Sequence, residues 1–258
     1  MLRKFDYLWP WFNRSIWLLL LLLCVGMAER KLSKLRCKDL VVKVDYESGM
    51  RFVNQTDVEK LLTNNGSDPL QGNKHSELPL GVLEQRVKKN KLVKNCQVFR
   101  DLDGNLVIEV EQEKPLARWV TSSRNGEWRK TDGFYINEEG SFLPLSDRFS
   151  ARTLLVSGPF FQNLNDLNGK KGKSVLDLIR FVTTDAFWQA QVIQLIVDKE
   201  GEVELLTALG NQRVEFGLAE NIEPKLTKLR IFYEEVMHTD WSRYSKISVK
   251  FRDQIVCE

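Results

Sequence analysis

The sequence predicts an α+β fold with an N-terminal transmembrane helix, a small domain of order β-α-α-β-β, and a mixed β-sheet domain with flanking helices. Three observations predict it. An uncharged apolar run lies near the N-terminus. Between residues 83 and 119 the apolar period changes from 3.6 to 2, as expected where a helix gives way to a hairpin. After residue 115, short alternating segments are separated by turn residues, which is typical of a β-sheet.

The composition favours two ordinary folded domains. The chain has 258 residues, of which 43% are hydrophobic and 28% are charged, as in average globular proteins. A net charge of +3 is too small to indicate a nucleic acid or an acidic substrate as the ligand. The two histidines and four cysteines leave little material for a metal centre or a histidine-based active site, so we expect no metal, no cofactor and no small-molecule substrate.

The apolar run predicts a membrane anchor. Residues 16–28 carry no charge, but as a helix they would be only roughly 20 Å long, against a hydrocarbon core of roughly 30 Å. Counting from Leu8 extends the helix to roughly 31 Å, and tryptophans at its start suit the membrane interface. We therefore expect a cytoplasmic tail at residues 1–15, and a transmembrane helix with a juxtamembrane segment at residues 16–36. A signal peptide cleaved after Ala28 is the alternative.

The flanking charges do not agree with the orientation that we expect. More lysine and arginine follows the apolar run than precedes it, and the positive-inside rule alone would place the downstream side in the cytoplasm. However, everything after Ala28 is one long folded region, and long domains cross the membrane largely regardless of flanking charge. We therefore expect the N-terminus inside and the folded domains outside the cytoplasmic membrane.

The small domain is predicted at residues 39–114. A strand is indicated by alternation at Leu40, Val42 and Val44, and a short helix by a capping box at residues 56–59. Residues 64–77 are rich in Asn, Gly, Ser and Pro, which predicts a long loop. The second helix and the hairpin follow, with turn residues at 101–104 and these apolar positions on the two strands: Cys96, Val98, Leu106, Ile108 and Val110.

The sheet domain is predicted at residues 115–258. Short strands are indicated at 118–120, 134–136 and 154–156, with a turn at Asn125-Gly126 between the first two. A helix is expected from Lys173 to Gln189, with Ser174 as its candidate N-cap. A hairpin is then expected at 192–197 and 203–206, followed by a strand at 213–217. A helix at 222–237 and a strand at 246–251 complete this domain. The helix residues expected to face inward are Leu226, Leu229, Phe232, Tyr233 and Val236.

The last predicted strand is half-buried. Ile247, Val249 and Phe251 alternate with Ser248 and Lys250, so the two sets face opposite sides of the sheet. A last strand often lies at a sheet edge, and lysine on an edge discourages unwanted pairing. We therefore expect this strand to form the edge of the sheet.

No combination of residues predicts catalysis. His75 and His238 have no second histidine or cysteine at ligand spacing, and Gly172-Lys173-Ser174 lacks the glycine that a phosphate-binding loop needs five residues earlier. We therefore predict a protein that is not an enzyme.

For two groups of side chains we predict a structural role and not a functional one. Cys96 is expected to be a buried small residue, with a Cys37–Cys96 disulfide as the alternative. A solvated helix face is the expected role of Lys88, Lys89, Lys91 and Lys94, with a basic patch for a partner as the alternative.

Two motifs carry a resemblance to a known family. The β-α-α-β-β order resembles a POTRA domain, and EKPLARW at 113–119 together with GFYINEEGSFLPL at 133–145 resembles the FtsQ/DivIB family of bacterial cell-division proteins. A short tail, one membrane span, a POTRA domain and a β-rich domain form the layout of that family. The long loop at 64–77 departs from its shorter members.

The resemblance implies a scaffold of the divisome. Members of the family bind FtsB/DivIC and FtsL partners through the last β-rich region, where a partner strand is added to the sheet edge and backbone hydrogen bonds supply affinity. The POTRA domain of the family is associated with septal localisation and other septal proteins. The implied place is the division septum at the inner membrane. The partner-binding residues that the resemblance implies are Lys246, Ile247, Ser248, Val249, Lys250, Phe251, Leu229 and Tyr233.

Two alternatives of other classes are a POTRA-containing envelope chaperone or secretion component and an anchored envelope enzyme. The chaperone class usually carries a C-terminal membrane barrel, and this chain has no series of ten-residue lipid-facing strands. The enzyme class would need a cleft with perturbed titratable groups.

Overall fold

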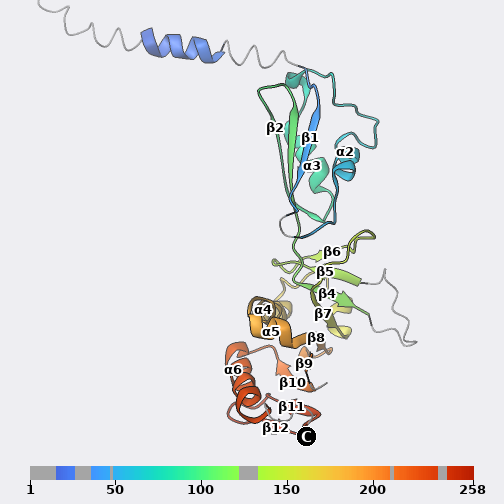
Figure 1. The fold of residues 1–258 in the computed structure, drawn as a ribbon, viewed down its shortest axis with the longest axis vertical. Coiled ribbons are helices and arrows are strands. Elements are labelled where there is room, and N and C mark those ends of the chain that lie inside the picture. Colours follow the sequence, from blue (N-terminus) through green and yellow to red (C-terminus); the bar gives the residue numbers. More distant parts are fainter. Residues whose placement is uncertain (1–15, 27–35, 47–48, 122–132, 210–211, 238–242) are drawn as a thin grey trace, which may run out of the picture. The chain divides into compact units, whose positions relative to one another are not determined.

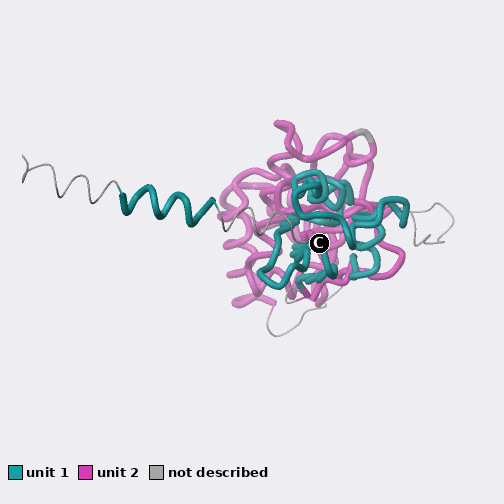
Figure 2. Tube along the Cα trace, turned by 90° about the horizontal axis from the view of Figure 1, so that it is seen from above, with its two compact units in different colours: residues 1–45, 53–112 teal, residues 46–52, 113–258 magenta. Residues whose placement is uncertain are grey.

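The computed structural model describes residues 16–26, 36–46, 49–121, 133–209, 212–237 and 243–258. The chain forms two compact units, one made of residues 1–45 and 53–112 and the other of residues 46–52 and 113–258 (Figure 2). The segment 46–52 belongs to the second unit because the Phe52 ring packs 5.5 Å from the Tyr135 ring and 5.2 Å from the Phe149 ring, between centroids.

The prediction of a transmembrane helix is wrong. The described N-terminal helix covers residues 16–26, a length of roughly 16 Å against the roughly 30 Å of a hydrocarbon core. Across the described ranges, no helix is both long and apolar enough to cross a membrane. The predicted tail at residues 1–15 lies outside the described residues.

The first unit has the predicted order of two helices and three strands. Its elements are β1 (Leu40–Val44), α2 (Gln55–Leu62), the 3₁₀ turn η1 (His75–Glu77), α3 (Leu80–Lys88), β2 (Val93–Arg100) and β3 (Leu106–Gln112). The strand order is β1-β3-β2, with β1 parallel and β2 antiparallel to the central β3 (Figure 1). Side chains of both helices, among them Val58, Leu62, Leu83 and Val87, are buried in its core.

One local prediction in the first unit needs correction. The helix α2 is capped by Asn54 and not by Thr56: the Asn54 side chain accepts from the Asp57 amide at 2.8 Å, and Asp57 accepts from the Asn54 amide at 3.3 Å. The long loop predicted at 64–77 is confirmed, apart from the 3₁₀ turn η1 at its end, and the Cys37 amide donates to the Asn73 carbonyl of this loop at 2.9 Å.

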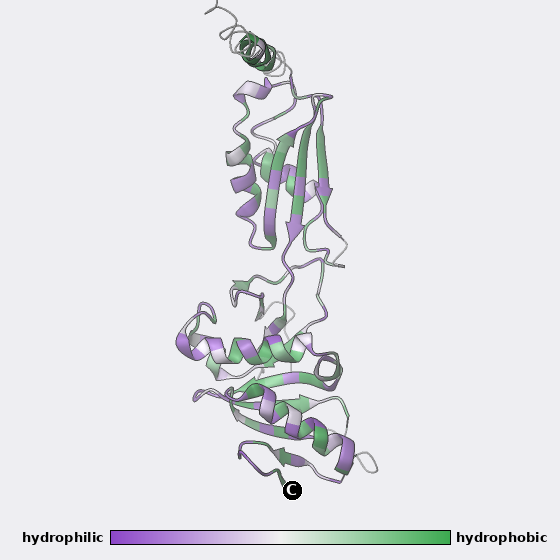
Figure 3. Cartoon of the chain, turned by 90° about the vertical axis from the view of Figure 1, so that its left-hand side faces the viewer, coloured by the Kyte–Doolittle hydropathy of each residue, from purple (hydrophilic) through white to green (hydrophobic). Residues whose placement is uncertain are grey.

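The second unit is built on a nine-stranded sheet of order β12-β11-β10-β9-β8-β7-β4-β5-β6. Helices α4, α5 and α6 lie on one face of this sheet (Figures 1 and 3) and share its apolar core. The elements are β4 (Ala117–Val120), β5 (Gly133–Ile136), β6 (Phe142–Leu143), β7 (Leu154–Ser157), η2 (Pro159–Asn163), α4 (Lys170–Thr184), α5 (Ala186–Gln191), β8 (Val192–Val197), β9 (Glu202–Thr207), β10 (Arg213–Leu218), α6 (Ile222–Phe232), the π turn η3 (Tyr233–Met237), β11 (Lys246–Ser248) and β12 (Val256–Cys257).

Two predicted helices are divided in the structure. The helix expected at 173–189 is α4 and α5, because the Asp185 carboxylate accepts from the amides of Phe187 and Trp188 and begins a new helix. α4 begins after Gly169, so Ser174 is not its N-cap. The helix expected at 222–237 is α6 followed by η3. The predicted turn at Asn125-Gly126 and His238 lie outside the described residues.

The last strand differs most from its prediction. β11 ends at Ser248 and runs parallel to β10, while β12 pairs with β11 antiparallel and forms the edge. The expectation that residues 246–251 make one edge strand is therefore wrong. The predicted alternation of buried residues extends from Ile247 to Val249 but not to Phe251, because Val249 is buried and Phe251 is exposed.

Candidate partner-binding edge

An exposed strand edge offers backbone groups to which another strand can bond. The described strands have four such edges: β1 and β2 in the first unit, and β6 and β12 in the second. What covers the outward N–H and C=O groups of each edge decides which of them is available to a partner.

The β2 edge is capped by side chains. The amide of Val98 donates to the Glu84 carboxylate at 2.9 Å, and the amide of Cys96 donates to the Asn95 side-chain oxygen at 2.9 Å. Glu84 lies on α3, so the helix that packs beside β2 also supplies an acceptor to its edge. A partner strand would have to displace these side chains before it could accept from the same amides.

The β1 edge and the β6 edge are covered in part. On β1, the Val42 carbonyl accepts from the Gln55 side chain of α2 at 3.0 Å. Beside β6, Ser141 forms a bridge with Asp166, and the Leu167 amide donates to the Gly140 carbonyl at 2.9 Å. Each edge therefore already has a bonding partner from within its own unit.

The β12 edge is open at Cys257. Lys246 and Glu258 exchange both backbone hydrogen bonds, at 3.1 and 3.0 Å, so they form a hydrogen-bonded pair of an antiparallel ladder. Such pairs alternate with pairs whose backbone groups point away from each other. The N–H and C=O of Cys257, which is opposite Ile247, thus face away from β11. In the described part of the chain, neither group has a hydrogen-bond partner.

A groove of about 320 Å³ lies beside this edge, on the sheet face opposite the helices. Phe251 and Val256 expose 51% and 41% of their surfaces there, which gives the groove an apolar side. The lining residues are Glu215, Lys246, Ser248, Lys250, Phe251, Val256 and Glu258.

The charges of the groove are largely paired within the unit. Lys246 lies 2.9 Å from the Glu215 carboxylate and 4.0 Å from that of Glu258, and Lys250 lies 2.7 Å from Glu202. The hydrogen bond from Lys246 lowers the pKa of Glu215 and raises the pKa of Lys246. The groove is therefore polar at its floor but offers no excess charge of one sign.

The structure brings some of the sequence-predicted residues together and separates others from the surface. Lys246, Ser248, Lys250 and Phe251 line the groove. The remaining four are buried in the core of the second unit: Ile247, Val249, Leu229 and Tyr233. Burial raises the pKa of the Tyr233 hydroxyl to about 12. These four can support the edge but cannot contact a partner there directly.

Val256 and Cys257, which form the edge itself, are not predicted by any pattern in the sequence. A strand of two residues is too short for an alternating pattern to reveal it. The only signal in the sequence is a second apolar segment, Ile255 to Cys257, separated from the predicted last strand by charged residues.

The other candidate sites have structural roles. His75 is buried, with its Nε2 atom 3.2 Å from the Gly104 carbonyl oxygen. Among the described residues, no three His, Cys, Asp or Glu side chains could hold a metal ion together. Cys37 and Cys96 are buried free thiols, so the alternative of a disulfide between them is wrong, and burial raises the pKa of Cys96 to about 11.

Two family models match the chain. One is described as FtsQ/DivIB, C-terminal related, and matches residues 127–258, which is about half of the chain and most of the second unit. The other is described as a POTRA-like domain and matches residues 35–111 in the first unit. No curated protein matches the chain.

Proposed function

The chain belongs to the FtsQ/DivIB family, and we propose that it binds FtsB/DivIC-like and FtsL-like division proteins by adding a partner strand to the β12 edge. Both matched domain types are of the non-enzymatic scaffold kind. The family supports a cell-division scaffold role, with partners among the division proteins and a place at the division site.

The open backbone groups of Cys257 are the observation that carries the proposal. A partner residue placed opposite Cys257 accepts from its N–H and donates to its C=O, which continues the ladder beyond β12. Each such hydrogen bond contributes about 0.5–1.5 kcal/mol net. Backbone bonding alone does not select a sequence, so specificity has to come from side chains along the added strand.

The groove supplies that specificity. Side chains of an added strand alternate between the two faces of the sheet, so every second one lies on the face of Phe251 and Val256. Apolar side chains there would cover the exposed surfaces of both residues. The paired charges of Lys246 and Glu258 surround this apolar part and resemble the polar rim of a protein interface.

The first unit contributes to the scaffold in another way in this proposal. Its β1 edge has a side-chain cap from Gln55 of α2, and its β2 edge has caps from Glu84 of α3 and from Asn95 of β2 itself, so strand addition is disfavoured there. Other septal proteins that bind the POTRA-like unit would contact one of its faces. Val41 and Phe99, which flank Val107 on adjacent strands, are exposed on such a face.

Replacing Cys257 by proline tests the proposal. Proline has no N–H, but this N–H does not take part in pairing with β11, so β12 should stay in place. We expect co-purification of the full chain with its FtsB/DivIC-like and FtsL-like partners to be lost. The matched control is Cys257→Ala, which removes the thiol and keeps the N–H.

Equal partner recovery with Cys257→Pro and Cys257→Ala would contradict the proposal. Deleting residues 245–258 is a poorer test, because Ile247 and Val249 belong to the core. Loss of binding after that deletion could reflect unfolding of the second unit.

A further inference from the structure

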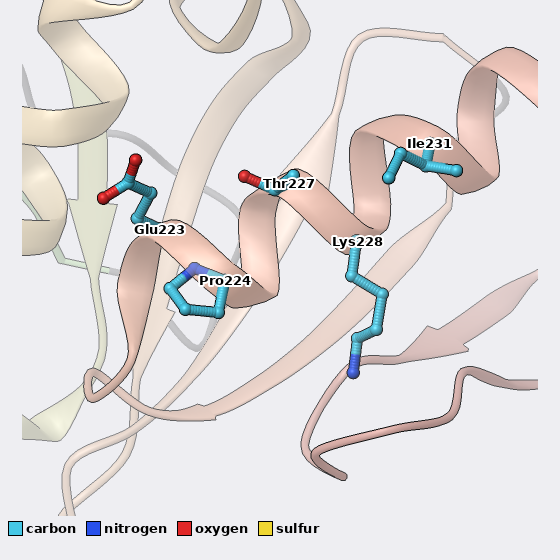
Figure 4. A pocket seen from close by; sticks show the side chains of 5 residues that line it. All are labelled: Glu223, Pro224, Thr227, Lys228 and Ile231. Carbon is cyan, nitrogen blue, oxygen red and sulfur yellow. The ribbon is translucent and has the colours of Figure 1, made fainter.

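The segment that leads from β11 to the open edge is held by a lysine from another element. Residues 249–254 lie between β11 and β12 and pair with no strand after Val249, whose amide donates to the Glu215 carbonyl at 3.0 Å. Lys228 of α6 extends toward this segment (Figure 4). Its ammonium contacts four carbonyl oxygens of the segment: Gln254 at 3.1 Å, Val249 at 3.4 Å, Arg252 at 3.5 Å, and Phe251.

These contacts form a cluster of acceptors around one positive charge. An ammonium has three N–H donors, so the four carbonyl groups share them. Hydrogen bonds from a charged donor are roughly twice as strong as bonds between neutral groups. Burial lowers the pKa of Lys228, and the carboxylate of Asp253 acts in the opposite direction. The carbonyl oxygens thus replace water that the ammonium has lost.

A second lysine, which belongs to the segment itself, bonds the segment to the sheet. Lys250 reaches from the segment to Glu202 of β9 at 2.7 Å. Its aliphatic chain passes over Gly217, where φ is +74° and an added Cβ atom would lie 3.0 Å from Lys250 Cγ. Gly217 sits at an irregularity in the pairing of β10 with β9. The segment is therefore attached to α6 by Lys228 and to the sheet by Lys250.

We propose that Lys228 is a positioning residue for the partner-binding edge, because it fixes the path of residues 249–254 and so places Phe251 and β12. This inference rests on the proposed function. The core contacts of α6 are made by Leu226 and Leu229, so the helix keeps its packing without the Lys228 ammonium. Loss of this charge therefore loosens the edge while the rest of the unit stays folded.

The test compares Lys228→Met with Lys225→Met in the full chain. Lys225 lies on the same helix, but its ammonium bonds to the carbonyl groups of Phe216 at 3.0 Å and Leu218 at 2.9 Å and not to the segment. Amide hydrogen exchange reports on the edge without any partner. Affinity for the co-expressed FtsB/DivIC-like protein reports on binding.

We expect Lys228→Met to accelerate exchange at residues 250–258 about tenfold or more while β8 to β10 keep their protection. Partner affinity should fall about tenfold, because a loosened segment has to lose conformational entropy when it becomes ordered on binding. Lys225→Met should cause neither change at residues 250–258. Lys228→Arg should restore most of the protection, because arginine keeps the charge and donors.

Three results would overturn the inference. They are unchanged exchange at residues 250–258 in Lys228→Met, equal acceleration in β8 to β10, and faster edge exchange with unaltered affinity. In the third case Cys257→Pro separates the two proposals. If that variant loses the partner, only the role of Lys228 fails. If it keeps the partner, the proposed function fails as well.

Discussion

The two sheets of this protein differ in how their edges are covered, and the difference lies at β12. In the first unit, Glu84 and Gln55 extend from the helices and bond to the outermost strands β2 and β1. In the second unit, β12 leaves the N–H and C=O of Cys257 without a partner among the described residues. Both sheets could accept a strand on topological grounds. In the proposed mechanism, a few side chains at each edge therefore decide where a partner strand can be added.

The comparison also separates residues that support an edge from residues that form it. Leu229 and Tyr233 have no exposed surface to offer a partner, since they are buried between α6 and the sheet. Phe251 and Val256 are the exposed apolar residues beside the open edge. If substitution of Leu229 or Tyr233 abolishes partner binding, the cause is loss of support for the edge. If substitution of Phe251 or Val256 abolishes it, the cause is loss of contact with the partner.

The largest expected effect follows from truncating a supporting residue. Leu229→Ala should destabilise the second unit by about 2–5 kcal/mol, because the cavity forms in a fully buried site. The first unit, which has its own core, should unfold at an unchanged denaturant concentration. Denaturation followed by tryptophan fluorescence and by exchange at β2 would separate the two transitions. Equal shifts in both would contradict the independence of the units.

A smaller effect is expected when the capped edge of the first unit is opened. Glu84→Ala removes the acceptor of the Val98 amide and should cost about 1–2 kcal/mol in the stability of that unit. Glu84→Gln is the matched variant, since it keeps an oxygen acceptor at the same place. Residue-resolved exchange should show faster exchange at Val98 in the alanine variant. A similar rate in both variants would show that Glu84 does not cap this edge.

The smallest effect is expected from the ion pair on the groove floor. The pKa of Glu215 is lowered by its hydrogen bond from Lys246, so the pair adds stability above the ordinary carboxyl pKa and loses it as the pH falls through the lowered value. Because both side chains of the pair are partly exposed, solvent screening should keep its contribution to stability small.

Glu215→Gln should therefore flatten the dependence of stability on pH between about pH 5 and pH 3. Urea denaturation across this range measures the slope. A variant with the same slope as the unaltered protein would show that another carboxylate dominates.

Much of the fold followed from periodicity and turn residues. The order of the first unit was predictable because its helices and strands are long enough for the period to change visibly at residues 83–119, and because the turn at 101–104 is short. The N-cap was misplaced since Asn54 precedes Asp57 by three residues just as Thr56 precedes Glu59. Both positions satisfy the pattern, and only the structure distinguishes them.

The site could be predicted only in part. Alternation and family resemblance predicted Lys246, Lys250 and Phe251 at the proposed binding surface, but they did not predict the edge itself. β12 has two residues and carries no periodic signal. The contacts of Lys228 with carbonyl groups more than twenty residues later depend on tertiary packing.

The most direct test of the proposed strand addition at β12 is residue-resolved hydrogen exchange of the full chain with and without the proposed FtsB/DivIC-like partner. Strand addition predicts that the amide of Cys257 becomes protected in the complex, while the amides of Cys96 and Val98 on the capped β2 edge keep their rates. Protection at Cys96 and Val98 with no change at Cys257 would contradict it.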